Sequence, residues 1–419
     1  MFKNIIYSLI TKGSVAIINF IILIISSRYL GVSSRGEISI FILNITVIQI
    51  VNDVYTGYSI VHFIPKFNFI KIIVYGVIFT LILCSLSNSL LWILNKQVKG
   101  YEWVGYILSL LVILNTFNCV LLLGNENIKA YNFLSFIQPF LLLFGIGFYL
   151  FVLKKYTFDA FVYPLLFSFS FSFLISTFLQ FRFLKRKFTV NKYQLKPILV
   201  NGFMFQVATL TFVFVNRYSY YLLPDISNVG LYSSASSLME AVLIIVNGIF
   251  PVLLARVSNA GNTPKIIDLT LVLSKASFLF STMCVLILLL IPDSFFVFIL
   301  GEGFHGIKNL MLRYSPGILL ISLFGSMSYY FSAIGKQKLV FACYSIGFIS
   351  SLIFAPFLIS RYGVNGAAHN ANIAYLLIAI AVCSSFMRIT KLSSERFFSF
   401  RTDYKYLKDF IFSKEIAHL

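Results

Sequence analysis

Six ionisable side chains lie inside long apolar stretches of the sequence, where a charge is costly and usually serves a function. They are the four cations Lys12, Arg217, Lys275 and Arg313 and the two acids Asp53 and Glu240. Basic side chains can bind phosphate or another anion, and an arginine can do so through two parallel hydrogen bonds. The sequence therefore predicts anion binding by the four cations, and uptake and release of H⁺ or Na⁺ by the two acids.

A structural interpretation of the same residues stays open, because a long basic side chain can reach the headgroup region from within a span. For Lys12, Lys275 and Arg217, contact with the headgroup region explains a charge within a span as well as anion binding does. The two carboxylates reach less far. Glu240 lies about 14 Å from the outer start of its stretch at 1.5 Å per residue, near the middle of a ~30 Å hydrocarbon core.

Motifs for catalysis and cofactor binding are weak or missing. Gly301, Gly303 and Gly306 match G-x-G-x-x-G. They lie between two apolar stretches and not between a strand and a helix, so a turn is the better interpretation. The sequence has no P-loop and no nucleophile–histidine arrangement, and its five cysteines are far apart. We therefore expect a protein that is not an enzyme and has no cofactor and no metal site, apart from coupling to H⁺ or Na⁺.

The composition is that of an integral membrane protein. Hydrophobic residues make up 59% of the 419 residues and charged residues 11%, against about 25% charged residues in a soluble domain. A membrane-spanning helix needs ~20 apolar residues. The predicted spans are 5–27, 38–63, 72–94, 104–123, 132–153, 159–181, 197–222, 231–254, 269–291, 307–332, 338–359 and 366–388. We expect about 12 transmembrane helices in an all-α fold, because the stretches are continuously apolar and do not alternate as barrel strands do.

A basic segment in the middle of the chain divides these spans into two sets of six. The expected parts are an N-terminal six-helix bundle (1–181), a basic cytoplasmic linker (182–196), a C-terminal six-helix bundle (197–388) and a cytoplasmic amphipathic tail (389–419). Because six is even, the bundles would be related as a parallel pseudo-repeat. When basic residues at the span ends (Lys308, Lys338 and Arg388) are counted with the adjoining segments, the segments predicted to be cytoplasmic hold 21 Lys and Arg against 8 in the outer loops, which places both termini in the cytoplasm.

Several short motifs occur in order along the chain and together resemble a known family. They are Ser27–Gly31 followed by Arg35–Glu37, Val229–Ala235, Leu300–Phe304, and Ala333–Lys336 followed by Arg361–Ala368. With these motifs the chain resembles the Wzx-type oligosaccharide-lipid flippases of the multidrug/oligosaccharidyl-lipid/polysaccharide exporter superfamily. Members of that family often carry Asp-Arg where this chain has Asn216-Arg217. This difference predicts that Arg217 is not charge-paired and is free to meet an anion.

The resemblance implies a central cavity lined largely by spans one, two, seven and eight, which carry Lys12, Asp53, Arg217 and Glu240. It implies a flippase that moves an undecaprenyl-diphosphate-linked oligosaccharide across the bacterial inner membrane for O-antigen or capsule synthesis. The expected partners are this lipid-linked substrate, membrane lipids and other polysaccharide-assembly membrane proteins, but no nucleic acid. Two alternatives stay open. One is a cation-coupled multidrug exporter of the same superfamily, and the other is a membrane polysaccharide polymerase or ligase, which would need a large outer loop.

Overall fold

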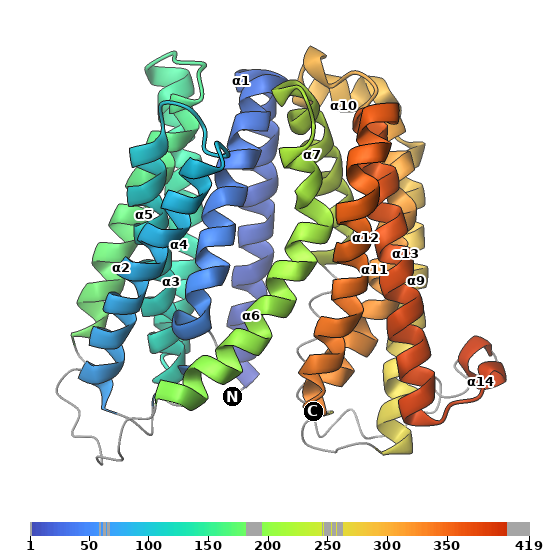
Figure 1. Ribbon diagram of the computed structural model, residues 1–419. Coiled ribbons are helices and arrows are strands. Elements are labelled where there is room, and N and C mark those ends of the chain that lie inside the picture. Colours follow the sequence, from blue (N-terminus) through green and yellow to red (C-terminus); the bar gives the residue numbers. More distant parts are fainter. Residues whose placement is uncertain are drawn as a thin grey trace. The chain divides into compact units, whose positions relative to one another are not determined.

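Helices form almost all of the described chain, and none of the described residues forms a strand (Figure 1). The computed structural model describes residues 2–57, 60–61, 64, 68–181, 195–244, 246, 253, 257 and 263–399. Its helices are α1 (Phe2–Thr56), α2 (Phe69–Ile93), α3 (Glu102–Gly124), α4 (Ile128–Gly147), α5 (Asp159–Gln180), α6 (Leu195–Arg217), α7 (Ile226–Glu240), α9 (Pro264–Leu290), α10 (Asp293–Leu300), α11 (Ile307–Ala333), α12 (Gln337–Tyr362), α13 (Val364–Thr390) and α14 (Ser394–Phe398). Short helical turns of other types are formed by Phe148–Val152, Tyr218–Tyr221 and Glu302–Phe304.

Ten of the described helices are long and apolar enough to cross a membrane. Helix α1 covers the first two predicted spans, so these ten helices account for eleven of the twelve. The remaining predicted span, 231–254, begins in α7 and runs beyond the described residues, as do most of the linker (182–194) and the end of the tail (400–419). The predicted all-α membrane architecture is confirmed, and the chain is a multi-pass membrane protein. The pseudo-repeat stays a prediction, as does the amphipathic helix of the tail, which falls largely outside the described residues.

Helix α1 differs from the sequence prediction, which separated two spans by a loop at 28–37. Within α1 only Gly31 departs from helical backbone angles, with φ 79° and ψ 174°. A positive φ is readily adopted by glycine, which has no Cβ atom to clash with the backbone. A single residue therefore redirects the chain, and the second span starts without a loop.

Buried helix faces carry small and polar side chains, and exposed faces carry large apolar ones. In α5, Ser168, Ser172 and Ser176 are buried at steps of four, whereas Phe167 and Phe178 are exposed. Small residues let helices approach closely, and their hydroxyl groups form hydrogen bonds between or within helices. The apolar outer faces suit a lipid environment. This distribution of polarity is therefore that of a membrane bundle and not of a water-soluble one.

The chain folds as two compact units. The first unit contains Met1–Val213, Ser219–Ser234 and Asp293–Ile307. The second unit contains Phe214–Tyr218, Ala235–Pro292 and Lys308–Leu419. The first unit thus holds α1 to α5, α6 as far as Val213, the start of α7 and all of α10. The predicted bundle boundaries divide the chain by the order of its spans, whereas these two units divide it by contacts between residues. The units therefore do not test the boundaries, which stay a prediction.

Two glycines make the contact between α1 and the start of α7 in the first unit. A Cβ atom on Gly36 would lie 1.9 Å from a backbone carbonyl oxygen of α7, and one on Gly230 would lie 1.9 Å from a carbonyl oxygen of α1. No side-chain rotation can relieve a clash with backbone. Next to the crossing, Ser39 Oγ donates to Ser233 Oγ over 2.7 Å, and both residues are buried. The two helices are therefore in backbone contact at this point.

Helix α11 of the second unit contains a proline, and a side chain from α13 completes the interrupted turn. Directly after Pro316, the N–H of Gly317 would donate to the carbonyl of Arg313 in a regular helix. The side chain of Asn372 contacts both groups: its Nδ2 donates to the Arg313 carbonyl over 2.6 Å, and its Oδ1 accepts from Gly317 N over 2.9 Å. Both backbone groups are thus satisfied, as a bilayer requires.

The glycine crossing generates the first prediction. Gly36→Ala or Gly230→Ala should lower the free energy of unfolding by about 1–3 kcal/mol or more, because the added methyl group overpacks a backbone contact. The measurement is the thermal unfolding of detergent-solubilised protein. Gly13→Ala in the same helix is the control, since its added Cβ atom meets nothing within 4 Å. If Gly36→Ala and Gly13→Ala have the same melting temperature, the crossing is not close.

Candidate functional site

The principal charged cluster lies in the second unit, where Arg217 and Glu240 form an ion pair. Arg217 Nη2 lies 2.7 Å from Glu240 Oε2, and Arg217 Nη1 donates to Ser236 Oγ over 3.1 Å. Each residue ends its helix, Arg217 in α6 and Glu240 in α7. A cation at a helix C-terminus is stabilised by the unpaired carbonyl groups there. The structure thus brings together a predicted anion-binding residue and a predicted coupling residue.

Neutral donors from two further side chains complete the cluster around the other oxygen of Glu240. Asn216 Nδ2 donates to Glu240 Oε1, and Tyr314 Oη lies 3.4 Å from the same oxygen. The Tyr314 hydroxyl also donates to Asn216 Oδ1 over 2.8 Å, and Tyr314 is fully buried. The carboxylate is therefore held at both oxygens by groups from α6 and α11.

Partial exposure distinguishes this ion pair from a sealed core pair. The Arg217 and Glu240 side chains retain 24% and 28% of their accessible surface. A fully buried pair has a large desolvation cost that its mutual attraction often only balances. Here that cost is smaller, and a ligand can approach both charges from the exposed side.

The expectation that Arg217 is not charge-paired is wrong. It rested on the residue before Arg217, which is Asn216 in this chain and often Asp in the resembled family. The acid that pairs with Arg217 is instead Glu240, 23 residues further along the chain. Sequence reasoning also missed Tyr314, because a contact across 98 residues leaves no local signal.

Asp53 lies in the first unit and is surrounded by neutral polar groups. Thr56 Oγ1 donates to Asp53 Oδ1 over 3.2 Å, and the amide of Gln49 lies one helical turn before Asp53 on α1. Gln49 Nε2 in turn lies 3.5 Å from Thr116 Oγ1 of α3. A chain of polar side chains therefore leads from the acid into the interior of the first unit.

That chain ends at a polar cavity between α3, α4 and α5. The cavity has a volume of about 160 Å³, which is room for several water molecules. It is lined by Asn115, Thr116, Cys119, Val120, Tyr131, Leu134, Ser135, Gln138 and Phe169. The polar groups of this lining are amides and hydroxyls, and no lining residue is charged. Such a lining can hold water or an ion.

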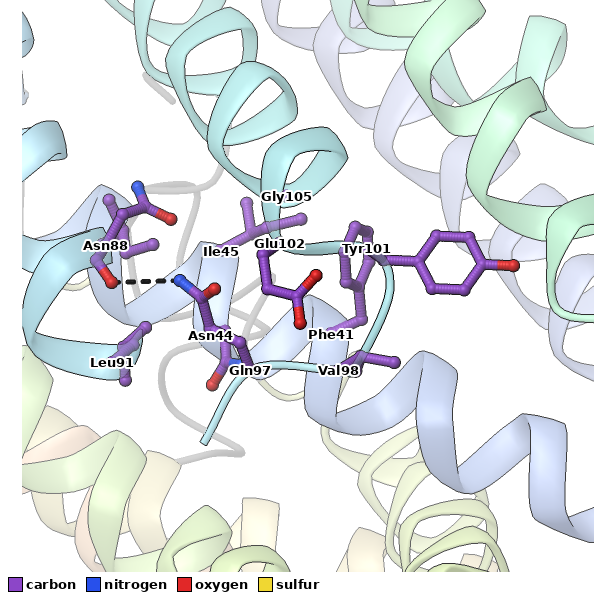
Figure 2. A pocket seen from close by; sticks show the side chains of 11 residues that line it. Phe41, Asn44, Ile45, Asn88, Leu91, Gln97, Val98, Tyr101, Glu102 and Gly105 are labelled. Carbon is purple, nitrogen blue, oxygen red and sulfur yellow. Dashed lines mark hydrogen bonds between the residues drawn. The ribbon is translucent and has the colours of Figure 1, made fainter. Parts of the chain in front are cut away.

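A second, smaller pocket lies between α1, α2 and the segment that leads into α3 (Figure 2). Gln97 Nε2 donates to the Asn88 carbonyl over 3.0 Å beside it, and Glu102 lies at its wall. Its volume of about 20 Å³ fits about one water molecule. This pocket is therefore too small for a substrate.

The other three predicted anion-binding residues have different surroundings. Lys12 is exposed on α1 in the first unit. In the second unit, Lys275 is buried on α9, and its Nζ donates to the Ser399 carbonyl over 3.1 Å. Arg313 is exposed on α11, with Nη1 3.4 Å from His369 Nε2. Lys275 thus contacts the start of the tail, and substrate contacts of these three cations stay a prediction.

Comparison with solved structures identifies the architecture. An inward-facing multidrug resistance MATE family transporter of the MOP superfamily superimposes with a TM-score of 0.71 at 15% identity, over 93% of this chain and 100% of that one. The chain has the fold of MATE transporters. The lipid II flippase MurJ in an inward closed conformation gives 0.65 at 16% identity over 100% and 99% of the two chains. The Vibrio cholerae MATE transporter VcmN in its bent form gives 0.59 at 13% identity over 95% and 98%.

No protein-family model and no curated protein matches the sequence. At 13–16% identity the structural likeness shows the fold and leaves the substrate open. The choice of substrate therefore depends on the chemistry of this chain's own residues.

The hydrogen bonds of Tyr314 generate the second prediction. Tyr314→Phe should lower the free energy of unfolding by about 1–3 kcal/mol, because it leaves the oxygen of Asn216 without its buried donor. Tyr362→Phe is the control, since Tyr362 is exposed in the same unit. Melting temperatures of the two variants in detergent provide the measurement. A Tyr314→Phe protein as stable as Tyr362→Phe would contradict the described cluster.

Proposed function

We propose that the chain is a flippase that carries an undecaprenyl-diphosphate-linked oligosaccharide from the inner to the outer leaflet of the bacterial inner membrane. The product would serve the assembly of a surface polysaccharide such as O-antigen or capsule. The observation that carries this proposal is Arg217, a partly exposed guanidinium inside a membrane fold that is paired with Glu240. The resemblance of its ordered motifs to Wzx-type flippases supports the same substrate class.

The chemistry required is translocation of a charged headgroup without bond making. A diphosphate that leaves water loses a large hydration energy unless cations and hydrogen-bond donors replace the water. Arg217 can replace it with two parallel charge-assisted hydrogen bonds. A cytoplasm-negative membrane potential favours outward movement of the anion by ~2.3 kcal/mol per charge per 100 mV. The proposal needs neither ATP nor a cofactor, and both chain termini would be cytoplasmic.

Further drive would come from inward movement of H⁺ or Na⁺ through the in-span acids. Asp53 is better placed for this than Glu240 because its described partners are neutral and lead to the polar cavity. Glu240 is already paired with Arg217. Substrate passage and ion passage would then use different units of the chain.

The alternative is a multidrug exporter, since several structures that share the fold are MATE transporters. An exporter of lipophilic cations would use Glu240 or Asp53 as the substrate's counter-ion, with Arg217 as an obstacle. In-span cations outnumber in-span acids by four to two, which favours an anionic substrate. Transport of a lipophilic cation by the purified protein, with no transport of a lipid diphosphate, would decide for the exporter.

Transport by Arg217 variants is the third prediction. In a deletion strain, Arg217→Lys should reduce polysaccharide export about tenfold or more and cause lipid-linked intermediates to accumulate. Lysine cannot form the paired hydrogen bonds of a guanidinium, each worth about 1.5–3 kcal/mol when charge-assisted. Lys12→Ala should also lower export, because a headgroup that enters from the cytoplasm would meet Lys12 before it reaches Arg217.

The matched control for Arg217→Lys is Arg396→Lys. Arg396 forms an ion pair with Asp268 in the same unit at the same 2.7 Å, and its side chain is 22% exposed. Lys99→Ala, in an exposed loop, is the control for Lys12→Ala. Parental export by both Arg217→Lys and Lys12→Ala, at matched protein levels, would overturn the anion-binding role of these residues.

Ion coupling through Asp53 is the fourth prediction. Asp53→Asn should lower flipping in proteoliposomes and abolish its dependence on a pH or sodium gradient, because a neutral amide cannot exchange an ion. Asp225→Asn, at an exposed position before α7, should keep the parental dependence. If Asp53→Asn retains the gradient dependence in full, this acid has no part in coupling.

A further inference from the structure

The carboxylate of Glu240 occupies the place on Arg217 where a phosphate oxygen would bind. Arg217 Nη2 donates to Glu240 Oε2 over 2.7 Å. Carboxylates and phosphates accept the same charge-assisted hydrogen bonds from a guanidinium group. We propose that Glu240 is a built-in competitor for the anionic headgroup, and that carboxylate and diphosphate alternate on Arg217 in each transport cycle. This inference rests on the proposed function.

The structure provides for the carboxylate when Arg217 leaves it. Arg217 holds Oε2, whereas Asn216 and Tyr314 stand at Oε1. A carboxylate that lost all its partners in an apolar bundle would be strongly destabilised. With the amide and the hydroxyl still in place, displacement by a phosphate breaks the contacts of one oxygen only.

Arg217 also keeps a partner during the exchange. Its Nη1 donates to Ser236 Oγ, one helical turn before Glu240 on α7. This hydroxyl occupies one N–H of Nη1, and the second N–H of Nη1 stays available beside Nη2 for two parallel hydrogen bonds to a phosphate. The partial exposure of the Arg217 and Glu240 side chains, 24% and 28%, gives an incoming anion access to the pair.

The exchange has a consequence for turnover. A cation with no internal partner would bind a diphosphate tightly and release it slowly, and tight binding of the ground state does not accelerate a cycle. Glu240 weakens binding of the headgroup and re-forms the ion pair as the headgroup departs. Glu240 acts through Arg217 and is a positioning residue that touches no substrate atom.

The test is a split between binding and transport. Farnesyl diphosphate serves as a soluble probe for binding to the detergent-purified full chain, measured by calorimetry. Glu240→Gln should bind this probe about tenfold more tightly, equivalent to about 1.4 kcal/mol, yet export polysaccharide more slowly than the parent. Arg217→Gln should abolish probe binding both alone and combined with Glu240→Gln. A merely structural role of Glu240 would lower both quantities or neither.

Asp268→Asn is the matched control, since it removes the acid of the other arginine ion pair in this unit, which has the same length. It should leave probe affinity unchanged. Glu240→Asp offers a second variant that keeps the charge but shortens its reach, and it should bind the probe with an affinity between those of the parent and Glu240→Gln. If Glu240→Gln does not fold, the affinity of Glu240→Asp for the probe tests the exchange in its place.

Two outcomes would overturn the exchange, and they differ in whether the proposed flippase function is also overturned. If the parent binds farnesyl diphosphate and Glu240→Gln binds it no more tightly, the exchange is wrong and the flippase proposal stands. If the parent binds tetraphenylphosphonium but not farnesyl diphosphate, both are wrong and the multidrug exporter is favoured.

Discussion

Compensation of the Arg217 charge is the constraint on which the arrangement of the second unit depends. A guanidinium group cannot lose its proton in a protein, so an apolar bundle must supply an anion and further acceptors to hold it. Glu240 supplies the anion, and Ser236 supplies a hydroxyl one turn away on the same helix. Satisfying Glu240 then requires Asn216 and Tyr314, which brings α11 to the ends of α6 and α7. One charge thus determines how three helices meet.

The first unit satisfies the same constraint with neutral groups. Its interior is rich in hydroxyls and amides, and Asp53 on α1 accepts a hydrogen bond from the hydroxyl of Thr56. Neutral partners allow an acid to change its protonation or its bound ion without breaking an ion pair. The two units therefore contain different kinds of acid: one fixed by a cation and one connected to a polar cavity.

Sequence reasoning succeeded where the physics is local and failed where it depends on distant contacts. Span positions follow from runs of apolar residues, and the cost of a buried charge was enough to single out Arg217 and Glu240. Their pairing could not be predicted, because nothing in either segment specifies which acid faces which cation. The break expected between the first two spans does occur at Gly31, but a single glycine makes it and not a loop. The backbone contact at Gly36 and Gly230 depends on a pairing of helices that only the folded chain reveals.

Asn372 gives helix α11 a property that a continuous helix lacks. In a regular helix, bending at one turn breaks a backbone hydrogen bond and leaves two polar groups bare in hydrocarbon. At Pro316 the Asn372 side chain already supplies a donor to the carbonyl group and an acceptor to the N–H group of such a pair. When α11 bends at this turn, the Asn372 amide can rotate and keep its contacts with both backbone groups. Bending here therefore exposes no bare polar group to hydrocarbon. Tyr314 lies two residues before Pro316, and a bend there would move its hydroxyl relative to Glu240.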